Sequence, residues 1–120
     1  MNPETPLMRR IMYALSRAGA IVFRNNVGGT ATASGGWVDY GLCKGSSDLI
    51  GWNTITITSA MVGQRVAVFL ACEVKKPGAP LTTPQKNFIA TVNEAGGIAF
   101  KADSEQDAVT KLEFILRERT

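Results

Sequence analysis

The chain has 120 residues, 45% of them hydrophobic and 19% charged, which suffices for the core of one domain but not of two. Its 13 basic and 10 acidic residues give a formal net charge of +3, which permits a polyanionic partner without requiring one. The chain has no histidine, which excludes Ser-His-Asp triads, the usual Cys-His proteases and histidine-based zinc sites.

The N-terminal stretch has an early acid and no apolar signal core, and no apolar run approaches the roughly 20 residues needed to cross a bilayer. We therefore expect a cytoplasmic protein without a membrane segment, located in the host cell cytoplasm if its origin is viral. Cys72 lies in an apolar strand pattern, where we expect a buried and reduced thiol.

The first third of the chain predicts a helix, a strand and a loop. Residues 5–19 place apolar side chains at i, i+3, i+4 and i+7, the period of an amphipathic helix. Residues 20–25 predict a short strand. Residues 25–36 are rich in Gly, Ser, Thr and Ala, which predicts a long loop, either a flexible loop that binds a nucleic-acid strand or a hairpin tip.

The middle of the chain predicts three strands in succession. Residues 46–53 form a short apolar strand, and residues 54–60 alternate cleanly between apolar and polar side chains. Residues 64–76 predict the longest strand, with a continuous apolar stretch that is typical of a central strand buried on both faces.

The last third predicts a helix, a strand and a second helix. Thr83 is expected to cap a helix over residues 84–97, and residues 97–103 predict a strand. Ser104 is expected to cap the final helix over residues 104–119.

This order of elements, α-β-β-β-β-α-β-α, predicts one domain over residues 1–120, of the α/β class or of the α+β class. The β-α-β step from residue 64 to residue 103 should be a right-handed crossover, which makes the last strand parallel to the longest one. We expect a mixed central β-sheet with helices on its faces.

An acid and a base stand at the end of the longest predicted strand. Glu73 and Lys75 are two residues apart, so both side chains should lie on one face while Val74 points into the core. The ordinary interpretation is a surface ion pair of little energetic value. The apolar run before Glu73 instead favours a central strand, whose end lies at the sheet edge where α/β folds bind ligands.

A second acid, Asp48, stands at the start of the strand over residues 46–53. In isolation it is an ordinary turn aspartate. If both strands belong to one sheet, Asp48 and Glu73 converge, and two close carboxylates repel each other unless a cation lies between them. Mg²⁺ or Mn²⁺ prefers such oxygen ligands, and the backbone carbonyl of Val74 would add another. Lys75 would then position a water molecule or stabilise negative charge.

Asp48, a spacer of 24 residues and the sequence Glu73-Val74-Lys75 together resemble the D…E-x-K core of the PD-(D/E)XK nuclease superfamily. The stretches 43–52 and 72–88 resemble more narrowly the VRR-NUC (virus-type replication-repair nuclease) family. The matching residues form a turn before a strand, an acid-x-lysine strand end and a glutamine just inside the next helix: Lys44, Gly45, Asp48, Leu49, Glu73, Lys75 and Gln85. Ser47 replaces the proline that precedes the aspartate in the superfamily pattern.

This resemblance implies a restriction-endonuclease-like core and a metal-dependent, structure-selective DNA endonuclease. It implies a homodimer and branched substrates such as Holliday junctions or flaps. The catalytic residues would be Asp48, Glu73, Lys75 and Gln85, with Gln85 orienting Lys75 or the phosphate. The alternative for Gln85 is a solvent-exposed residue of an early helical turn.

Family members often carry a metal-binding glutamate in the first helix, for which Glu4 is the candidate. Glu4 equally suits the first turn of a helix, where an acid complements the helix dipole. Basic residues near the predicted site are candidates for contacts with DNA phosphates and are otherwise solvated surface charges: Arg9, Arg10, Lys44, Lys76 and Lys86. Trp37 follows the 25–36 loop and would stack on a base if this loop binds DNA, although we expect packing roles for Trp37 and Trp52.

Two other function classes remain open. One is a non-catalytic nucleic-acid-binding module on a nuclease fold, against which the intact Asp48, Glu73 and Lys75 argue. The other is a structural or assembly protein in which Glu73 and Lys75 form only a surface pair. Cleavage assays with metal and alanine substitutions separate these alternatives.

Overall fold

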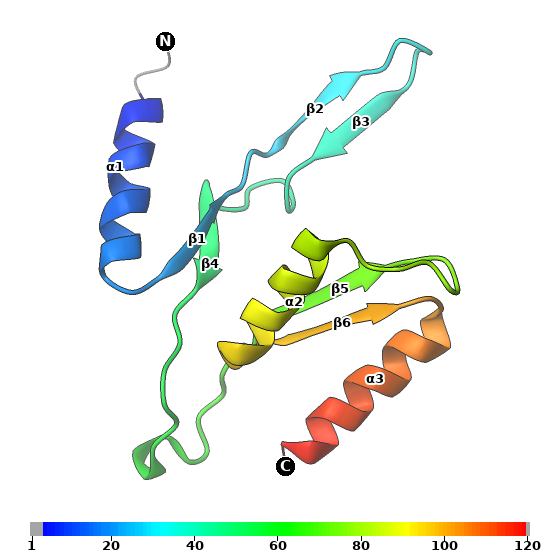
Figure 1. Cartoon of the computed structure of the whole chain (residues 1–120). Coiled ribbons are helices and arrows are strands. Elements are labelled where there is room, and N and C mark those ends of the chain that lie inside the picture. The colour runs from blue at the N-terminus through cyan, green and yellow to red at the C-terminus, as the bar shows by residue number, and fades with distance from the viewer. Residues whose placement is uncertain (1–3, 120) are drawn as a thin grey trace. The chain divides into compact units, whose positions relative to one another are not determined.

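The computed structural model describes residues 4–119 of the chain, and of Glu4 and Thr5 it describes only the backbone. The chain divides into two compact units, Met1–Ile55 and Thr56–Thr120, each described by itself. The first unit holds α1 (Glu4–Arg17), β1 (Ile21–Arg24), β2 (Gly28–Ala31), β3 (Trp37–Tyr40) and β4 (Leu49–Trp52). The second holds a 3₁₀ turn (Ser59–Met61), β5 (Leu70–Val74), α2 (Thr83–Glu94), β6 (Ile98–Ala102) and α3 (Glu105–Glu118) (Figure 1).

In the first unit, α1 packs against β1, which pairs antiparallel with β4. The Phe23 and Trp52 rings on these two strands contact each other, with centroids 5.7 Å apart. The strands approach so closely that a side chain at Gly51 would collide with the backbone carbonyl of Ile21. Glycine is therefore required at this position of β4.

The stretch 25–36 is only partly a loop, because residues 28–31 form β2 and pair antiparallel with β3. The prediction of a continuous loop was wrong because these glycines serve close packing rather than flexibility. A Cβ on Gly28 would lie 2.6 Å from the Tyr40 hydroxyl oxygen, and one on Gly29 would lie 2.5 Å from Trp37 Nε1. The glycines make room for aromatic rings across the hairpin, and Trp37 remains 65% exposed rather than buried in a core.

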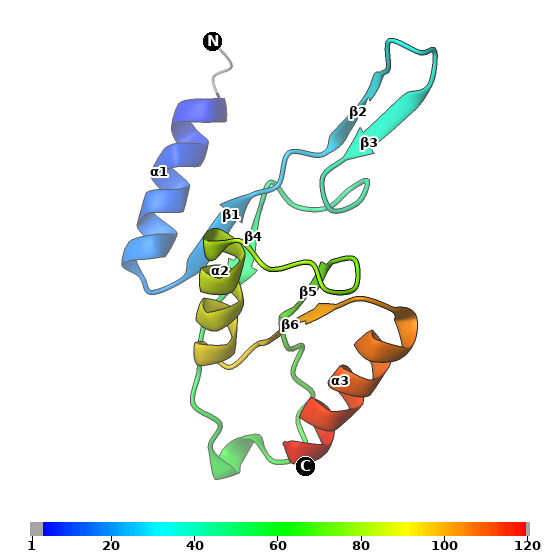
Figure 2. The same cartoon turned by 45° about the vertical axis from the view of Figure 1, so that its right-hand side comes forward.

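In the second unit, β5 and β6 pair in parallel, from Leu70 opposite Ile98 to Val74 opposite Ala102. This confirms the parallel arrangement expected from the β-α-β step. Both α2 and α3 pack against β6, and Figure 2 shows the two helices flanking the β5–β6 pair. The residues buried in this unit's core come from α2 and β6: Val92, Ile98, Ala99 and Ala102.

Two of the predicted strands differ from the structure. Residues 54–60 form no strand, and the strand predicted over residues 64–76 is limited to β5. An alternating or apolar pattern favours an extended backbone, but a strand also needs a hydrogen-bonded neighbour. In the described chain, residues 53–58 and 64–68 belong to no strand, and Ile57 is 75% exposed. Pairing with β6 begins only at Phe69, whose carbonyl accepts a hydrogen bond from the Ile98 backbone N–H at 2.8 Å.

The expectation that the longest strand is buried on both faces was also wrong. Val74 is 78% exposed and does not point into a core, and Cys72 is an exposed free thiol. The continuous apolar run therefore did not mean that both faces of β5 are buried. The described strands form three two-stranded sheets, β1–β4, β2–β3 and β5–β6, and the expected single central sheet is not confirmed.

The remaining elements agree with the predictions. The predicted helices and the predicted strands at residues 20–25, 46–53 and 97–103 correspond to α1, α2, α3, β1, β4 and β6. The chain is a mixed α/β protein. Within the described residues, no helix is long and apolar enough to span a membrane.

Candidate functional site

The end of β5 presents an acid and a base on the same side. Side-chain cover alternates along the strand, so that Ala71, Glu73 and Lys75 are partly covered while Cys72 and Val74 are exposed. The Lys75 backbone N–H donates to the Ala102 carbonyl at 3.0 Å, so the pairing with β6 continues one residue beyond Val74. Because strand side chains alternate between faces, Glu73 and Lys75 emerge on one face of β5.

Gln85 connects this carboxylate to the start of α2. Its Nε2 donates to Glu73 Oε1 at 2.7 Å, and its Oε1 accepts a hydrogen bond from the Thr82 backbone N–H at 2.9 Å. The Thr82 hydroxyl in turn accepts from the Gln85 backbone N–H at 3.3 Å, which completes a capping box. Both polar atoms of the Gln85 side chain are therefore occupied, and its rotamer is held from two directions.

The N-cap of α2 is Thr82, whereas Thr83 was predicted. Thr83 is the first helical residue and Pro84 follows it. The Thr-x-x-Gln spacing from Thr82 to Gln85 is that of a capping box, and this signal distinguishes the two threonines.

A cavity of about 420 Å³ lies against the Glu73–Gln85 contact. Its wall is formed by residues of β5 and of the first two turns of α2: Ala71, Cys72, Glu73, Pro84, Gln85, Phe88 and Ile89. The cavity is largely apolar apart from the carboxylate and the amide, so it offers a few directed polar atoms in an apolar surround.

Lys101 lies beside Glu73 on the neighbouring strand, although the sequence did not predict it as a site residue. It is the register partner of Glu73 on β6, so their side chains leave the same face of the parallel pair. Its Nζ donates to the Ala79 carbonyl at 3.1 Å, which ties β6 to the loop between β5 and α2. The available signal was a lysine interrupting an apolar strand, but its partner depends on a register that the sequence does not display.

Asp48 lies in the first unit, immediately before β4. Its carbonyl accepts a hydrogen bond from the Asn25 backbone N–H at 2.8 Å, which extends the β1–β4 pairing by one residue. Glu73, Lys75 and Gln85 lie in the second unit. The convergence of Asp48 with Glu73 stays a prediction.

The donor atoms are of the kind that suits a hard divalent cation. Asp48 and Glu73 offer carboxylate oxygens, and Val74 offers a backbone carbonyl next to Glu73. Within either unit, the described residues include no group of three or more Cys, Asp or Glu side chains that could hold an ion. The side chain of Glu4, the further candidate ligand, lies outside the described part of the chain.

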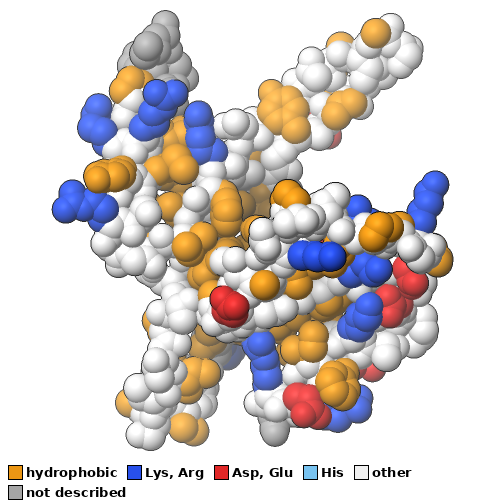
Figure 3. Space-filling model, viewed as in Figure 1, with side chains coloured by type: hydrophobic (Ala, Val, Ile, Leu, Met, Phe, Trp, Pro, Cys, Tyr) orange, Lys and Arg blue, Asp and Glu red, His pale blue; other side chains and the backbone are white. Residues whose placement is uncertain are grey.

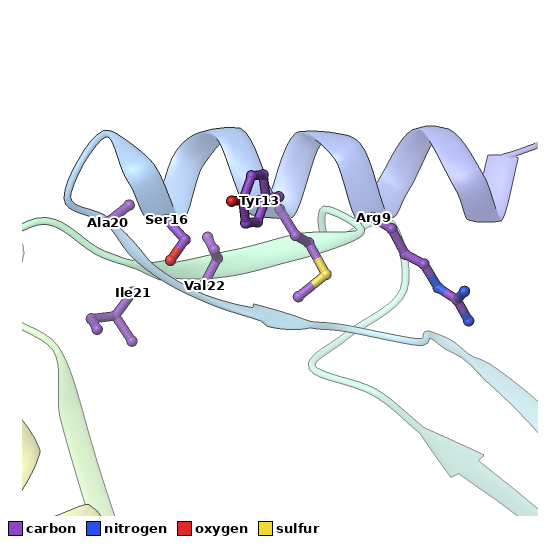
Figure 4. A pocket seen from close by; sticks show the side chains of 7 residues that line it. Arg9, Tyr13, Ser16, Ala20, Ile21 and Val22 are labelled. Carbon is purple, nitrogen blue, oxygen red and sulfur yellow. The ribbon is translucent and has the colours of Figure 1, made fainter.

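The five candidate DNA-binding residues are exposed, and they belong to both units: Arg9, Arg10, Lys44, Lys76 and Lys86. Figure 3 shows basic side chains gathered over α1, which contributes Arg9, Arg10 and Arg17. Arg9 also lines a second cavity, of about 410 Å³, between α1 and β1 (Figure 4). Tyr13 and Ser16 of α1 line this cavity opposite Ile21 and Val22 (Figure 4).

Comparison with known proteins identifies a family. The family model described as VRR-NUC domain matches residues 29–106, more than half of the chain. The matched stretch includes Asp48, Glu73, Lys75 and Gln85 and spans both units. Neither the curated proteins nor the solved structures contain a significant match.

Proposed function

Because the chain belongs to the VRR-NUC family of nuclease domains, we propose that it is a Mg²⁺- or Mn²⁺-dependent endonuclease that hydrolyses phosphodiester bonds in branched DNA. Holliday junctions and flaps are the proposed substrates. The observation that carries the proposal is that the family model covers Asp48, Glu73, Lys75 and Gln85 together. The hydrogen bond from Gln85 to Glu73 supports it, because it links two residues that the motif alone only places 12 positions apart.

We assign Asp48, Glu73 and the Val74 carbonyl as metal ligands. These residues would hold a divalent cation, which would supply charge neutralisation at the phosphoryl group and a lowered pKa of a water molecule. The contribution of the chain is to hold the Glu73 carboxylate in one orientation, since Gln85 Nε2 donates to its Oε1. Among the residues whose side chains are described, 6–119, none donates a hydrogen bond to Glu73 Oε2, and we assign this oxygen to the ligand.

We assign Lys75 to the stabilisation of negative charge. It emerges on the same face of β5 as Glu73, and its backbone is held against β6 by the bond to the Ala102 carbonyl. An ammonium group beside the reacting phosphate stabilises the charge that develops in the transition state or positions the attacking water. Lys76, which is exposed and lies beyond the end of β5, is assigned to the DNA backbone rather than to chemistry.

The DNA substrate would be contacted by the exposed cations Arg9, Arg10, Lys44, Lys76 and Lys86. A chain of 120 residues offers a small footprint for branched DNA, so we propose a homodimer that presents two active sites. The salt dependence of binding and sedimentation analysis test these two proposals separately.

Cleavage of a labelled four-way junction and a flap in Mg²⁺ or Mn²⁺ tests the proposed activity. Asp48→Asn, Glu73→Gln and Lys75→Ala should each abolish cleavage while the circular dichroism spectrum remains that of the wild type. Glu94→Gln, which alters an exposed acid at the end of α2, is the matched control and should cut normally. DNA binding without cleavage by the wild type in both metals would establish the non-catalytic binding module instead.

A further inference from the structure

Asn25 is a buried polar residue in an otherwise exposed part of the first unit. It directly follows β1 and is only 6% exposed, and it is the one buried polar or charged residue among residues 6–119. A buried amide persists in a fold only where its donors and acceptor have partners. The partners of Asn25 therefore show what this residue holds in place.

The Asn25 side chain binds three points of one segment. Its Nδ2 donates to Ser46 Oγ at 2.7 Å and to the Ser47 carbonyl at 2.9 Å. Its Oδ1 accepts from the Leu42 backbone N–H at 2.8 Å. With the backbone bond to the Asp48 carbonyl, Asn25 contacts residues along the whole segment 42–48, here called the Asp48 segment.

The Asp48 segment contains a turn from Cys43 to Ser46, and Asn25 binds the last residue of this turn. The Ser46 hydroxyl donates to the Cys43 carbonyl at 2.6 Å and accepts from the Cys43 backbone N–H at 3.3 Å. The hydroxyl is thus shared between the turn and Asn25. Just before the segment, Gly41 has φ +91° and lies so close to the backbone of Asn26 and Val27 that a Cβ would be 2.6 Å from the Asn26 carbonyl oxygen.

We propose that Asn25 is a positioning residue for the active site, because it fixes the Asp48 segment and with it the carboxylate that binds the metal. This inference rests on the proposed function, in which Asp48 is a ligand. Asn25 lies outside residues 29–106, the stretch that matches the family model. Only an amide of this length offers two donors and an acceptor together, since aspartate lacks the donors and serine is shorter.

The experiment uses the full-length chain and measures Mn²⁺ affinity by isothermal titration calorimetry, at a temperature where circular dichroism shows the protein folded. The Mg²⁺ concentration for half-maximal junction cleavage is measured in parallel. Asn25→Ala should weaken Mn²⁺ binding and raise that Mg²⁺ concentration by about 10- to 100-fold, the range seen when residues that orient metal ligands are removed. Asn26→Ala is the matched control, since this exposed neighbour should change neither value more than twofold.

A folded Asn25→Ala protein with wild-type Mn²⁺ affinity and Mg²⁺ dependence would overturn the proposal. If Asn25→Ala does not fold, Ser46→Ala decides, because it removes one of the three side-chain contacts and should shift both values several-fold. An unchanged Ser46→Ala protein then overturns the proposal. Asp48→Asn is measured alongside: if it keeps wild-type metal binding and cleavage, the proposed function fails, whereas an inactive Asp48→Asn with an unaffected Asn25→Ala rejects only the role of Asn25.

Discussion

Replacing Gln85 with glutamate turns its attractive contact with Glu73 into a repulsive one and preserves its contact with Thr82. The new carboxylate still accepts a hydrogen bond from the Thr82 backbone N–H, so the capping box remains. In the wild type, Gln85 Nε2 lies 2.7 Å from Glu73 Oε1 and donates to it. In the variant, a negatively charged oxygen takes the place of this nitrogen. The substitution therefore isolates the contact between α2 and the end of β5.

The expected cost follows from these two changes. A hydrogen bond to a charged group contributes roughly 1.5–3 kcal/mol, and the variant loses it. Two unit charges at the observed separation repel by about 1.5 kcal/mol in bulk water and about 6 kcal/mol at an effective dielectric constant near 20. Because Glu73 and Gln85 are only partly covered and can turn apart, we expect the lower end of both costs, a loss of about 3 kcal/mol in the free energy of unfolding.

Urea unfolding in EDTA at pH 7.5 measures this loss. At pH 4 the loss should shrink, because protonation of the added carboxyl removes the repulsion and restores a donor. The double variant Glu73→Gln/Gln85→Glu reverses the polarity of the bond and should recover stability to within about 1 kcal/mol of the wild type while remaining inactive. Gln106→Glu, a like change in the first turn of α3, is the control and should alter stability by less than about 0.5 kcal/mol.

A Gln85→Glu protein as stable as the wild type at pH 7.5 would refute the reasoning. So would a double variant no more stable than Gln85→Glu alone, because the contact would then contribute nothing to the fold. Either result would also remove the structural support for assigning Gln85 a role beside Glu73.

Two further predictions concern the second unit. Val92 is fully buried, so Val92→Ala should lower the free energy of unfolding by about 2 kcal/mol in urea, and a change below about 0.5 kcal/mol would show that α2 does not pack as described. The backbone hydrogen bond from Asp103, and next the bond from Lys111, lower the pKa of Asp107 below 3.8, so its ionised form stabilises the start of α3 at higher pH and this contribution is lost as pH falls through the lowered pKa. The melting temperature of the wild type should therefore exceed that of Asp107→Asn at pH 7, and the difference should shrink as the pH falls through the lowered pKa of Asp107. A difference that does not change with pH would contradict this cause.

Local signals predicted much of the second unit. Ser104 was expected to cap α3, and its hydroxyl accepts from the Asp107 backbone N–H at 3.0 Å. The place of Gln85 early in α2 and the shared face of Glu73 and Lys75 follow from helix and strand periodicity. These features depend on residues a few positions apart, which is why a single sequence displays them.

Features that depend on distant pairing could not be predicted in the same way. The clean alternation of residues 54–60 favours an extended backbone but does not supply a partner strand. Lys101 meets the loop beside Glu73 only through the parallel register, and Asn25 meets Leu42, Ser46 and Ser47 across 17 to 22 residues. These contacts form only when the chain folds and brings distant residues together, so the pattern of neighbouring residues does not reveal them.

The double engagement of Gln85 couples the dynamics of α2 to the chemistry of β5. The first turn of a helix frays more readily than its interior, and here fraying would withdraw the amide that holds the Glu73 carboxylate. Linkage then requires the reverse effect: a ligand that binds Glu73 in its held orientation stabilises the first turn and slows hydrogen exchange at the Thr82 amide. The order of this one helical turn would thus rise and fall with occupancy of the site.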